Sequence, residues 1–289
     1  GGNHDSPSFL NAPRQVLKAL RVHVIGEMAD NPKDEVILLA NSAGEPEAIV
    51  CAVPYLRDRD VRITEAGESQ EDKRRKLLDG ISRHYAEVAR IALQKTGNRP
   101  DIPIIGMGHL FTSGGKTLEG DGVRELYVGT LACINEESFP ACFDYLALGH
   151  LHLAQKVGAS ETKRYSGSPI PMGFSEAGQG KKVMIAEFNG RSPVVAERPI
   201  PCFRELVRIS GGKAEILSRI TELVARGSKA WLEIECTELI PSEDLAQMLE
   251  ETLSDSGMEI CRIKNRILTE RALKQSDTEE TLDDLSEPD

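Results

Sequence analysis

Four of the six histidines stand beside glycines in three short motifs, and these residues have the clearest capacity for chemistry. The motifs are Gly2-Asn3-His4-Asp5, Gly106-Met107-Gly108-His109 and Gly149-His150-Leu151-His152. Imidazole is the commonest metal-binding side chain, and an Asn amide oxygen is a hard donor that suits Mn²⁺ or Mg²⁺. Two histidines separated by one residue can reach two adjacent metals, or one metal and a substrate. The motifs therefore indicate a divalent-metal centre.

Such a centre suits hydrolysis of a phosphate ester. Two metals roughly 3.5–4 Å apart can clamp the attacking and leaving oxygens, and a metal lowers the pKa of bound water. His4 follows the candidate ligand Asn3 and could meet the leaving oxygen as an acid. Taken singly, the first motif could be an Asx turn that caps a helix, and the last could be surface histidines. Three motifs in this order are more specific than any one of them.

The elements that position these motifs are short apolar runs separated by turns. We expect strands at Val22–Ile25, Val36–Ala40, Ala48–Val53, Ile102–Met107, Leu126–Leu131, Tyr145–Leu148 and Val183–Phe188. Helices are expected from Ser6-Pro7 and over Glu71–Lys95, where apolar residues recur at helical spacing. His23 falls in an expected strand and His84 on the charged helix, and neither is given a functional role. Strand ends are where α/β proteins place functional groups.

The pattern changes after Pro199. Expected elements are a strand at Leu206–Ile209, a helix at Ala214–Ala225, a strand at Trp231–Cys236, a helix at Leu245–Leu253 and a strand at Met258–Ile263. This βαββ-like or βαβαβ-like unit predicts a small second domain. We expect a first domain over residues 1–199, the second over 200–268, and an acidic tail over 269–289.

Composition sets wider limits. The net charge of −11 argues against a large basic groove, because phosphate contacts normally require Lys and Arg. Bound metals or a partner could still supply part of a grip on DNA. No run approaches the roughly 18 apolar residues of a membrane span. The six cysteines form no CxxC pair and mostly sit in apolar runs, which indicates buried, reduced thiols and a cytoplasmic location.

These motifs resemble those of the calcineurin-like metallophosphoesterase superfamily, whose signature runs DxH, GDxxD, GNH[DE], a lone His and GHxH. The last three correspond to Gly2–Asp5, His109 and Gly149–His152. Longer segments resemble the SbcD family within it: Cys51–Asp60, Val128–Leu131, Asp144–His150 and Tyr165–Pro171. The likeness extends over essentially the whole chain.

The resemblance implies a structure and a task. The fold would be an α/β two-sheet sandwich, incomplete because N-terminal strands are missing, with a small α+β capping domain. Metal ligands would be Asn3, His109, His150 and His152 in a two-metal Mn²⁺ site, with His4 assisting catalysis. The family implies a 3′→5′ double-strand exonuclease and hairpin-opening endonuclease that acts in DNA repair, recombination and replication. It works with the SbcC ATPase, and a homodimer is possible.

The sequence departs from the family at its ends. DxH and GDxxD do not occur before Gly1, so we interpret the chain as truncated at the N-terminus, and at the C-terminus before the segment that docks on SbcC. The hypothesis is that this chain binds metal weakly and is inactive or nearly so. Two alternatives stay open: another phosphodiesterase or phosphatase of the superfamily, and a non-catalytic fragment or scaffold.

Overall fold

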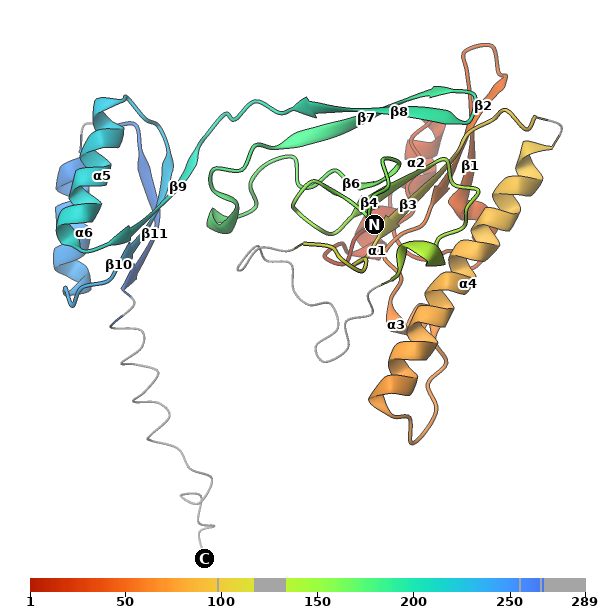
Figure 1. Ribbon diagram of the computed structural model, residues 1–289, viewed down its shortest axis with the longest axis horizontal. Helices are drawn as coiled ribbons and strands as arrows, with labels where there is room; N and C mark the ends of the chain where they lie inside the picture. The colour runs from red at the N-terminus through yellow and green to blue at the C-terminus, as the bar shows by residue number, and fades with distance from the viewer. Residues whose placement is uncertain (98, 117–133, 255, 266, 268–289) are drawn as a thin grey trace, which may run out of the picture. The chain divides into compact units, whose positions relative to one another are not determined.

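The computed structural model describes residues 1–97, 99–116, 134–254, 256–265 and 267. The chain divides into two compact units (Figure 1). The first comprises Gly1–Ile170 and Gly180–Ile200, and the second Pro171–Gln179 and Pro201–Asp289. The expected strand at Leu126–Leu131 and the acidic tail 269–289 lie outside the described residues. No helix in the described ranges is long and apolar enough to cross a membrane.

The first unit is built on a six-stranded sheet in the order β1-β2-β3-β4-β6-β5. Its strands are β1 (Val36–Ala40), β2 (Pro46–Ala52), β3 (Ile104–His109), β4 (Tyr145–Gly149), β5 (Gln155–Lys156) and β6 (Lys163–Tyr165). The inner pairs β2–β3, β3–β4 and β4–β6 are parallel, whereas β1 and β5 pair antiparallel at the edges. Parallel inner strands place the ends of β3 and β4, and hence their motifs, at one edge of the sheet.

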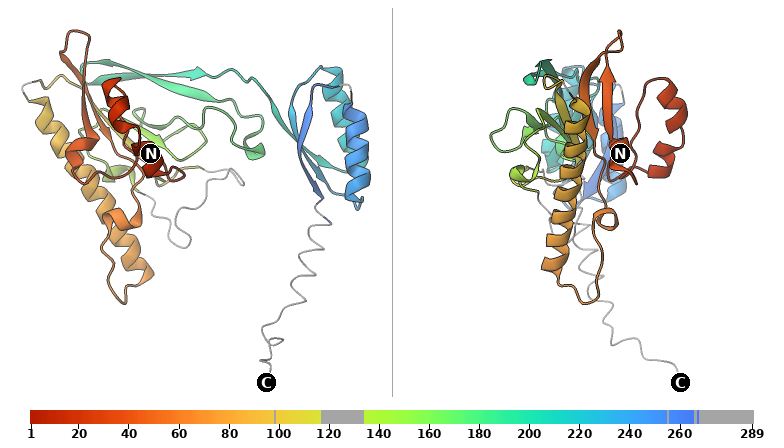
Figure 2. Two further views of the ribbon diagram at one scale, coloured as in Figure 1. Left: turned by 180° about the vertical axis from the view of Figure 1, so that it is seen from behind. Right: turned by 90° about the vertical axis from the view of Figure 1, so that its right-hand side faces the viewer.

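The long helix α4 (Gln70–Thr96) confirms the expected helix at 71–95. It begins at a capping box in which Ser69 and Asp72 bond reciprocally, and it ends at Gly97 with φ +54°. One face buries Ile81, Val88 and Ala92 in the core beneath the sheet. Three shorter helices are α1 (Pro7–Asn11), α2 (Arg14–Ala19) and α3 (Asp58–Val61). In the right-hand view of Figure 2, α1 and α2 lie across the sheet from α4.

The expected strand at Val22–Ile25 is wrong. The segment has no strand ladder, because its backbone groups are used elsewhere. The N–H of Val22 donates to the Leu17 carbonyl at 2.9 Å, at the end of α2. The Ile25 carbonyl accepts a 2.6 Å hydrogen bond from the Gly1 amino group. A run of apolar side chains alone does not distinguish a strand from an extended segment that makes no ladder hydrogen bonds.

A two-stranded hairpin completes the first unit. It consists of β7 (Lys182–Asn189) and β8 (Ser192–Pro199), of which only β7 was expected. Gly190 makes the turn with φ +57°. The hairpin is tied to the main sheet by ion pairs from Arg191 to Asp144 at 3.0 Å and from Arg164 to Glu197 at 3.0 Å. Short one-turn 3-10 segments occur in this unit at Pro32–Glu35 and Glu136–Ser138, and another, Phe174–Glu176, lies in the part of the chain that belongs to the second unit.

The second unit is a βαβαβ arrangement. Its elements are β9 (Leu206–Gly211), α5 (Lys213–Ala225), β10 (Trp231–Cys236), α6 (Ser242–Leu253) and β11 (Glu259–Asn265). All three strands are parallel, in the order β11-β10-β9, so the unit is α/β in character and the expected α+β description is wrong. Parallel strands require crossover connections, and each helix provides one. Both helices contribute to a single core with the sheet, through residues such as Ile216, Leu232 and Leu249.

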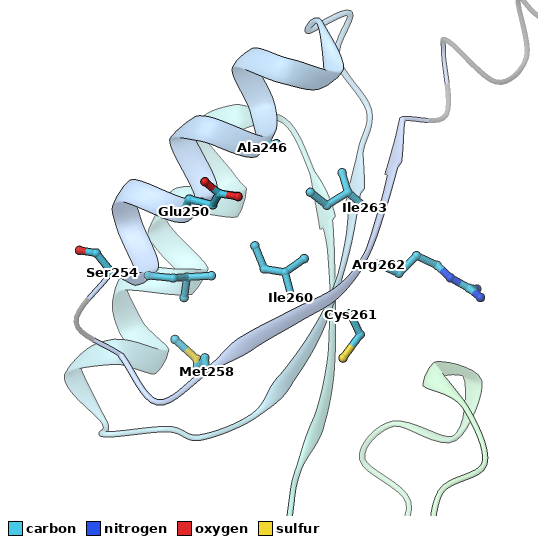
Figure 3. A pocket seen from close by; sticks show the side chains of 9 residues that line it. Ala246, Glu250, Ser254, Met258, Ile260, Cys261, Arg262 and Ile263 are labelled. Carbon is cyan, nitrogen blue, oxygen red and sulfur yellow. The ribbon is translucent and has the colours of Figure 1, made fainter.

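A hollow of about 560 Å³ lies between α6 and β11 in this unit (Figure 3). Ala246, Met258 and Ile260 give it an apolar lining, and Glu250 and Arg262 add charge. None of the residues expected to bind metal lines it. The mixed α/β class of the chain is confirmed by both units.

Candidate metal centre

The ends of β3 and β4 bring two of the three motifs together. The strands are parallel, and His109 stands directly beside Gly149 in their register. The chain start is held nearby, because the Tyr55 N–H donates to the Gly1 carbonyl at 2.8 Å. The first motif is closed as a tight turn by Asp5, whose carboxylate accepts from the Gly2 N–H at 2.6 Å.

Three of the expected metal ligands converge. Nε2 of His109 lies 2.7 Å from Oδ1 of Asn3. The rings of His109 and His150 have centroids 5.3 Å apart and are inclined by 65°. The ring of Tyr55 stands edge-on to His109, with centroids 6.2 Å apart. Two imidazoles and an amide oxygen from three separate motifs therefore share one small volume.

Glycines make room for the His109 ring. A Cβ on Gly2 would lie 2.8 Å from its Cε1 atom, and a Cβ on Gly149 would lie 3.1 Å from its Nδ1 atom. The loop after β4 is also strained, because His150 has φ +104°, a region that side chains other than glycine rarely occupy.

Burial and a neighbouring imidazole lower the pKa of His109 to about 4. Burial is the larger cause, because it disfavours the charged ring, and the proximity of His150 adds to it. His109 is therefore neutral at pH 7. A neutral imidazole is the form that ligates a metal.

His4 and His152 are linked to the cluster of Asn3, His109 and His150 by weaker evidence than a measured side-chain distance. His4 is exposed but close enough to contribute to the lowered pKa of His109. His152 is half-buried and lies in the same loop as His150. Its backbone carbonyl accepts hydrogen bonds from the Ser168 N–H at 3.1 Å and from Nζ of Lys181 at 3.5 Å.

The donor set fits a divalent metal in part. Imidazole nitrogen and amide oxygen both suit a hard-to-borderline ion. Among the residues that the structure describes, however, no group of three or more His, Cys, Asp or Glu is arranged to hold a metal. The carboxylate within the first motif, that of Asp5, accepts a hydrogen bond from the Gly2 N–H. The observed cluster thus offers Asn3, His109 and His150 without a bridging carboxylate.

Sequence reasoning missed several residues around the centre. Tyr55 packs against His109, and Ser168 and Lys181 hold the His152 carbonyl. Tyr55 and Ser168 lie in segments singled out only by resemblance, and no spacing rule identifies Lys181. His84 also has a partner that was not foreseen: its Nε2 lies 2.7 Å from the fully buried carboxylate of Glu35.

Known proteins similar to this chain include several SbcD nuclease components. A family model, SbcD_C, described as the type 5 capsule protein repressor C-terminal domain, matches residues 202–289. The chain is 34% identical over 289 residues to the SbcD component of the nuclease SbcCD from Escherichia coli strain K12, covering 99% of this chain and 70% of that protein. The proteins of the same name from Bacillus subtilis strain 168 and Rhodobacter capsulatus are each 32% identical, over 81% and 77% of this chain and 58% and 55% of their own lengths.

The fold and the cluster define a mixed α/β protein in which histidines and an asparagine gather at the ends of parallel strands. With relatives at this identity over nearly all of its length, the chain belongs to the SbcD family.

Proposed function

We propose that the chain is part of a metal-dependent DNA nuclease subunit that hydrolyses phosphodiester bonds. The observation that carries the proposal is the convergence of Asn3, His109 and His150 at one edge of the sheet. The names of its relatives, which describe a nuclease, point to the same class of reaction. Double-strand 3′→5′ exonuclease and hairpin-opening endonuclease activities are the forms of this function that the family resemblance suggests.

The proposed fold is the two-sheet sandwich of the metallophosphoesterases, with residues 200–268 as a capping domain. The parallel strands β2, β3, β4 and β6 would belong to one of the two sheets. The match of residues 202–289 to a C-terminal family model supports the position of the cap.

Each residue of the centre has a proposed task. Asn3, His109, His150 and His152 would hold Mn²⁺, which when bound lowers the pKa of a water molecule and polarises the phosphate. His109 is neutral at pH 7 because its pKa is lowered to about 4, so one of its ring nitrogens has a lone pair that could coordinate the metal. His4 is exposed beside the centre and could donate a proton to the leaving oxygen. Tyr55, whose ring stands edge-on to His109, would cover one side of that ring.

The proposed partners are an SbcC-type ATPase and double-stranded or hairpin DNA. The relatives are named as components of an SbcCD nuclease, which supports assembly with SbcC. A net charge of −11 disfavours DNA binding by this chain alone, so we expect the partner and the metal to supply much of the grip on DNA. A homodimer and a cytoplasmic location are part of the same proposal.

The test compares matched histidine variants. We would measure Mn²⁺ binding by calorimetry, and hydrolysis of a labelled hairpin DNA and of a chromogenic phosphodiester, each with and without the SbcC-type ATPase. His109→Ala should weaken Mn²⁺ binding at least tenfold. His23→Ala is the control, because His23 lies outside the cluster and lines a separate apolar hollow.

The outcomes separate the alternatives. Equal Mn²⁺ affinity in both variants would remove His109 from the metal centre. Hydrolysis of the small diester but not of the hairpin DNA would favour another phosphodiesterase of the superfamily. If neither this chain nor a longer product that carries DxH and GDxxD hydrolyses either substrate, while both bind the ATPase, the protein would be a scaffold. The coding sequence upstream of Gly1 should also be read, and any longer product that carries DxH and GDxxD should be assayed in parallel.

A further inference from the structure

The backbone carbonyl of His152 is held by a small buried cluster. The Ser168 N–H donates to it at 3.1 Å. Nζ of Lys181 lies 3.5 Å from the same oxygen and donates to Oγ of Ser168 at 2.9 Å. The exposed fractions of Ser168 and Lys181 are only 8% and 9%. Lysine is almost never this deeply buried unless its ammonium group has polar partners, and the His152 carbonyl and the Ser168 hydroxyl are two of the partners of Lys181.

Gly167 is what allows the cluster to form. Its φ is +78°, and a Cβ at this position would lie 2.6 Å from the His152 carbonyl oxygen and 2.8 Å from the Ala154 nitrogen. Any other residue would push the two loops apart. The approach of Ser168 to His152 therefore depends on glycine, both for its backbone conformation and for the missing side chain.

The held carbonyl lies two residues beyond a strained position. His150 has φ +104°, and such a conformation persists only where the surroundings over-determine it. The strand β4 fixes the loop on one side, ending at Gly149. The hydrogen bonds to the His152 carbonyl fix it on the other side. The two histidines thus lie in a loop that is clamped at both ends.

We propose that Lys181, Ser168 and Gly167 are positioning residues that orient His152, and through the loop His150, in the metal centre. The proposal rests on the proposed function, because it assigns His152 to that centre. In this role none of the three would touch the metal or the substrate. They act as outer partners whose loss loosens the ligands, and such losses typically weaken metal affinity about 10–100-fold.

The sharpest test uses two glycines with nearly the same positive φ. Gly167 and Gly178 have φ values of +78° and +76°, but a Cβ on Gly178 would meet nothing within 4 Å. Gly167→Ala and Gly178→Ala therefore both place a side chain at a positive φ of nearly the same value, and only the first brings a Cβ against the His152 carbonyl. Lys181→Met is paired in the same way with Lys182→Met, because Lys182 makes an ion pair with Glu197 on the exposed hairpin.

Two readouts are needed. The first is the ¹³Cε1 signal of His152 in histidine-labelled protein without metal, which reports the environment of the ring. The second is Mn²⁺ affinity by calorimetry. We expect Gly167→Ala and Lys181→Met to shift the His152 signal and to weaken Mn²⁺ binding about 10–100-fold. Gly178→Ala and Lys182→Met should do neither. Lys181→Gln keeps an N–H donor and should recover part of the loss.

Ser168→Ala is a milder variant that remains informative if Gly167→Ala or Lys181→Met does not fold. It removes the hydroxyl bonded to Lys181 but keeps the backbone N–H that donates to the His152 carbonyl. It should shift the His152 signal less than Gly167→Ala does. The proposal is overturned if the His152 signal in Gly167→Ala matches that in Gly178→Ala, or if Lys181→Met lowers only the melting temperature. If the unaltered chain binds no Mn²⁺, the proposed function fails for this chain, while the metal-free His152 signal still decides whether the cluster orients the ring.

Discussion

The buried pair between Glu35 and His84 offers the strongest test of how the first unit is held together. Oε2 of Glu35 lies 2.7 Å from Nε2 of His84, and their side chains are 0% and 7% exposed. The second carboxylate oxygen of Glu35 accepts from the Ala29 N–H at 2.8 Å. The pair joins the segment before β1 to the middle of α4. His84→Leu should therefore leave a buried carboxylate oxygen without its partner.

The expected magnitudes follow from this burial. Removing one partner of a buried pair costs about 3–5 kcal/mol, and we take about 3 kcal/mol for His84→Leu. Glu35→Gln keeps an acceptor for Ala29 and an amide for the ring, so it should cost about 1 kcal/mol. In the double variant only a neutral amide is orphaned, at about 2 kcal/mol. The coupling between the two positions is then about 2 kcal/mol.

An exposed pair on the same helix is the control. Arg90 and Glu87 lie 2.6 Å apart, closer than the buried pair, but their side chains are 52% and 42% exposed. The cycle of Glu87→Gln and Arg90→Leu should give a coupling of at most about 0.5 kcal/mol. If distance alone set the energy, the two cycles would agree.

Urea denaturation provides the assay. Far-UV circular dichroism follows both units, whereas fluorescence of Trp231, the one tryptophan in the sequence, reports the second unit. With a slope of about 2 kcal/mol per molar urea, His84→Leu should lower the circular-dichroism midpoint of the first unit by about 1.5 M. The Trp231 transition serves as the internal reference. A coupling for Glu35 and His84 no larger than that of the exposed pair would refute the reasoning.

Three further outcomes are expected. Gly108→Ala should destabilise the first unit by about 1–3 kcal/mol in urea, because its Cβ would lie 2.1 Å from the hydroxyl of Tyr85. Cys261 is exposed and should react with a maleimide within minutes, whereas Cys51 should stay protected in native protein, since burial raises its pKa to about 12. Burial alone would raise the pKa of Glu233, but hydrogen bonds from Lys264 and Arg208 lower it overall. The charged Glu233 therefore stabilises the fold fully at pH values above its pKa in the unfolded chain, about 4.3, and this stabilisation is lost as the pH falls through its lower pKa in the folded chain. In urea denaturation followed by Trp231 fluorescence, the difference in unfolding free energy between Glu233→Gln and the unaltered chain should vanish in acid.

Regular elements with strong local signals were predictable from the sequence. The helix α4 has apolar residues at helical spacing and a Ser–Asp capping box at its start. The strand β1 coincides with the expected Val36–Ala40. In the second unit all five expected elements were found with small shifts of their ends. In these segments the pattern of burial within a few residues determines the structure.

Features that depend on distant partners were not predictable. Val22–Ile25 is apolar like a strand, but its backbone bonds go to Leu17 and Gly1. The strand β8 (Ser192–Pro199) includes Pro193 and ends at Pro199. Proline disfavours strands because it has no N–H to donate, but the single partner β7 leaves one edge of β8 free to accommodate it. The expectation of buried cysteines was wrong for Cys202 and Cys261, which are exposed.

The glycines of the three motifs show why the site could be located but not built from sequence. The glycines suggest that another part of the molecule comes close to the backbone at these positions, and the structure shows which side chains do so. Gly2 and Gly149 leave space for the ring of His109, and Gly108 leaves space for Tyr85 of α4. The glycines therefore serve side chains from other motifs and elements. Each motif shows in the sequence which of its residues could bind a metal. The side chain for which its glycine leaves space is known only from the folded structure, in which the strands are paired.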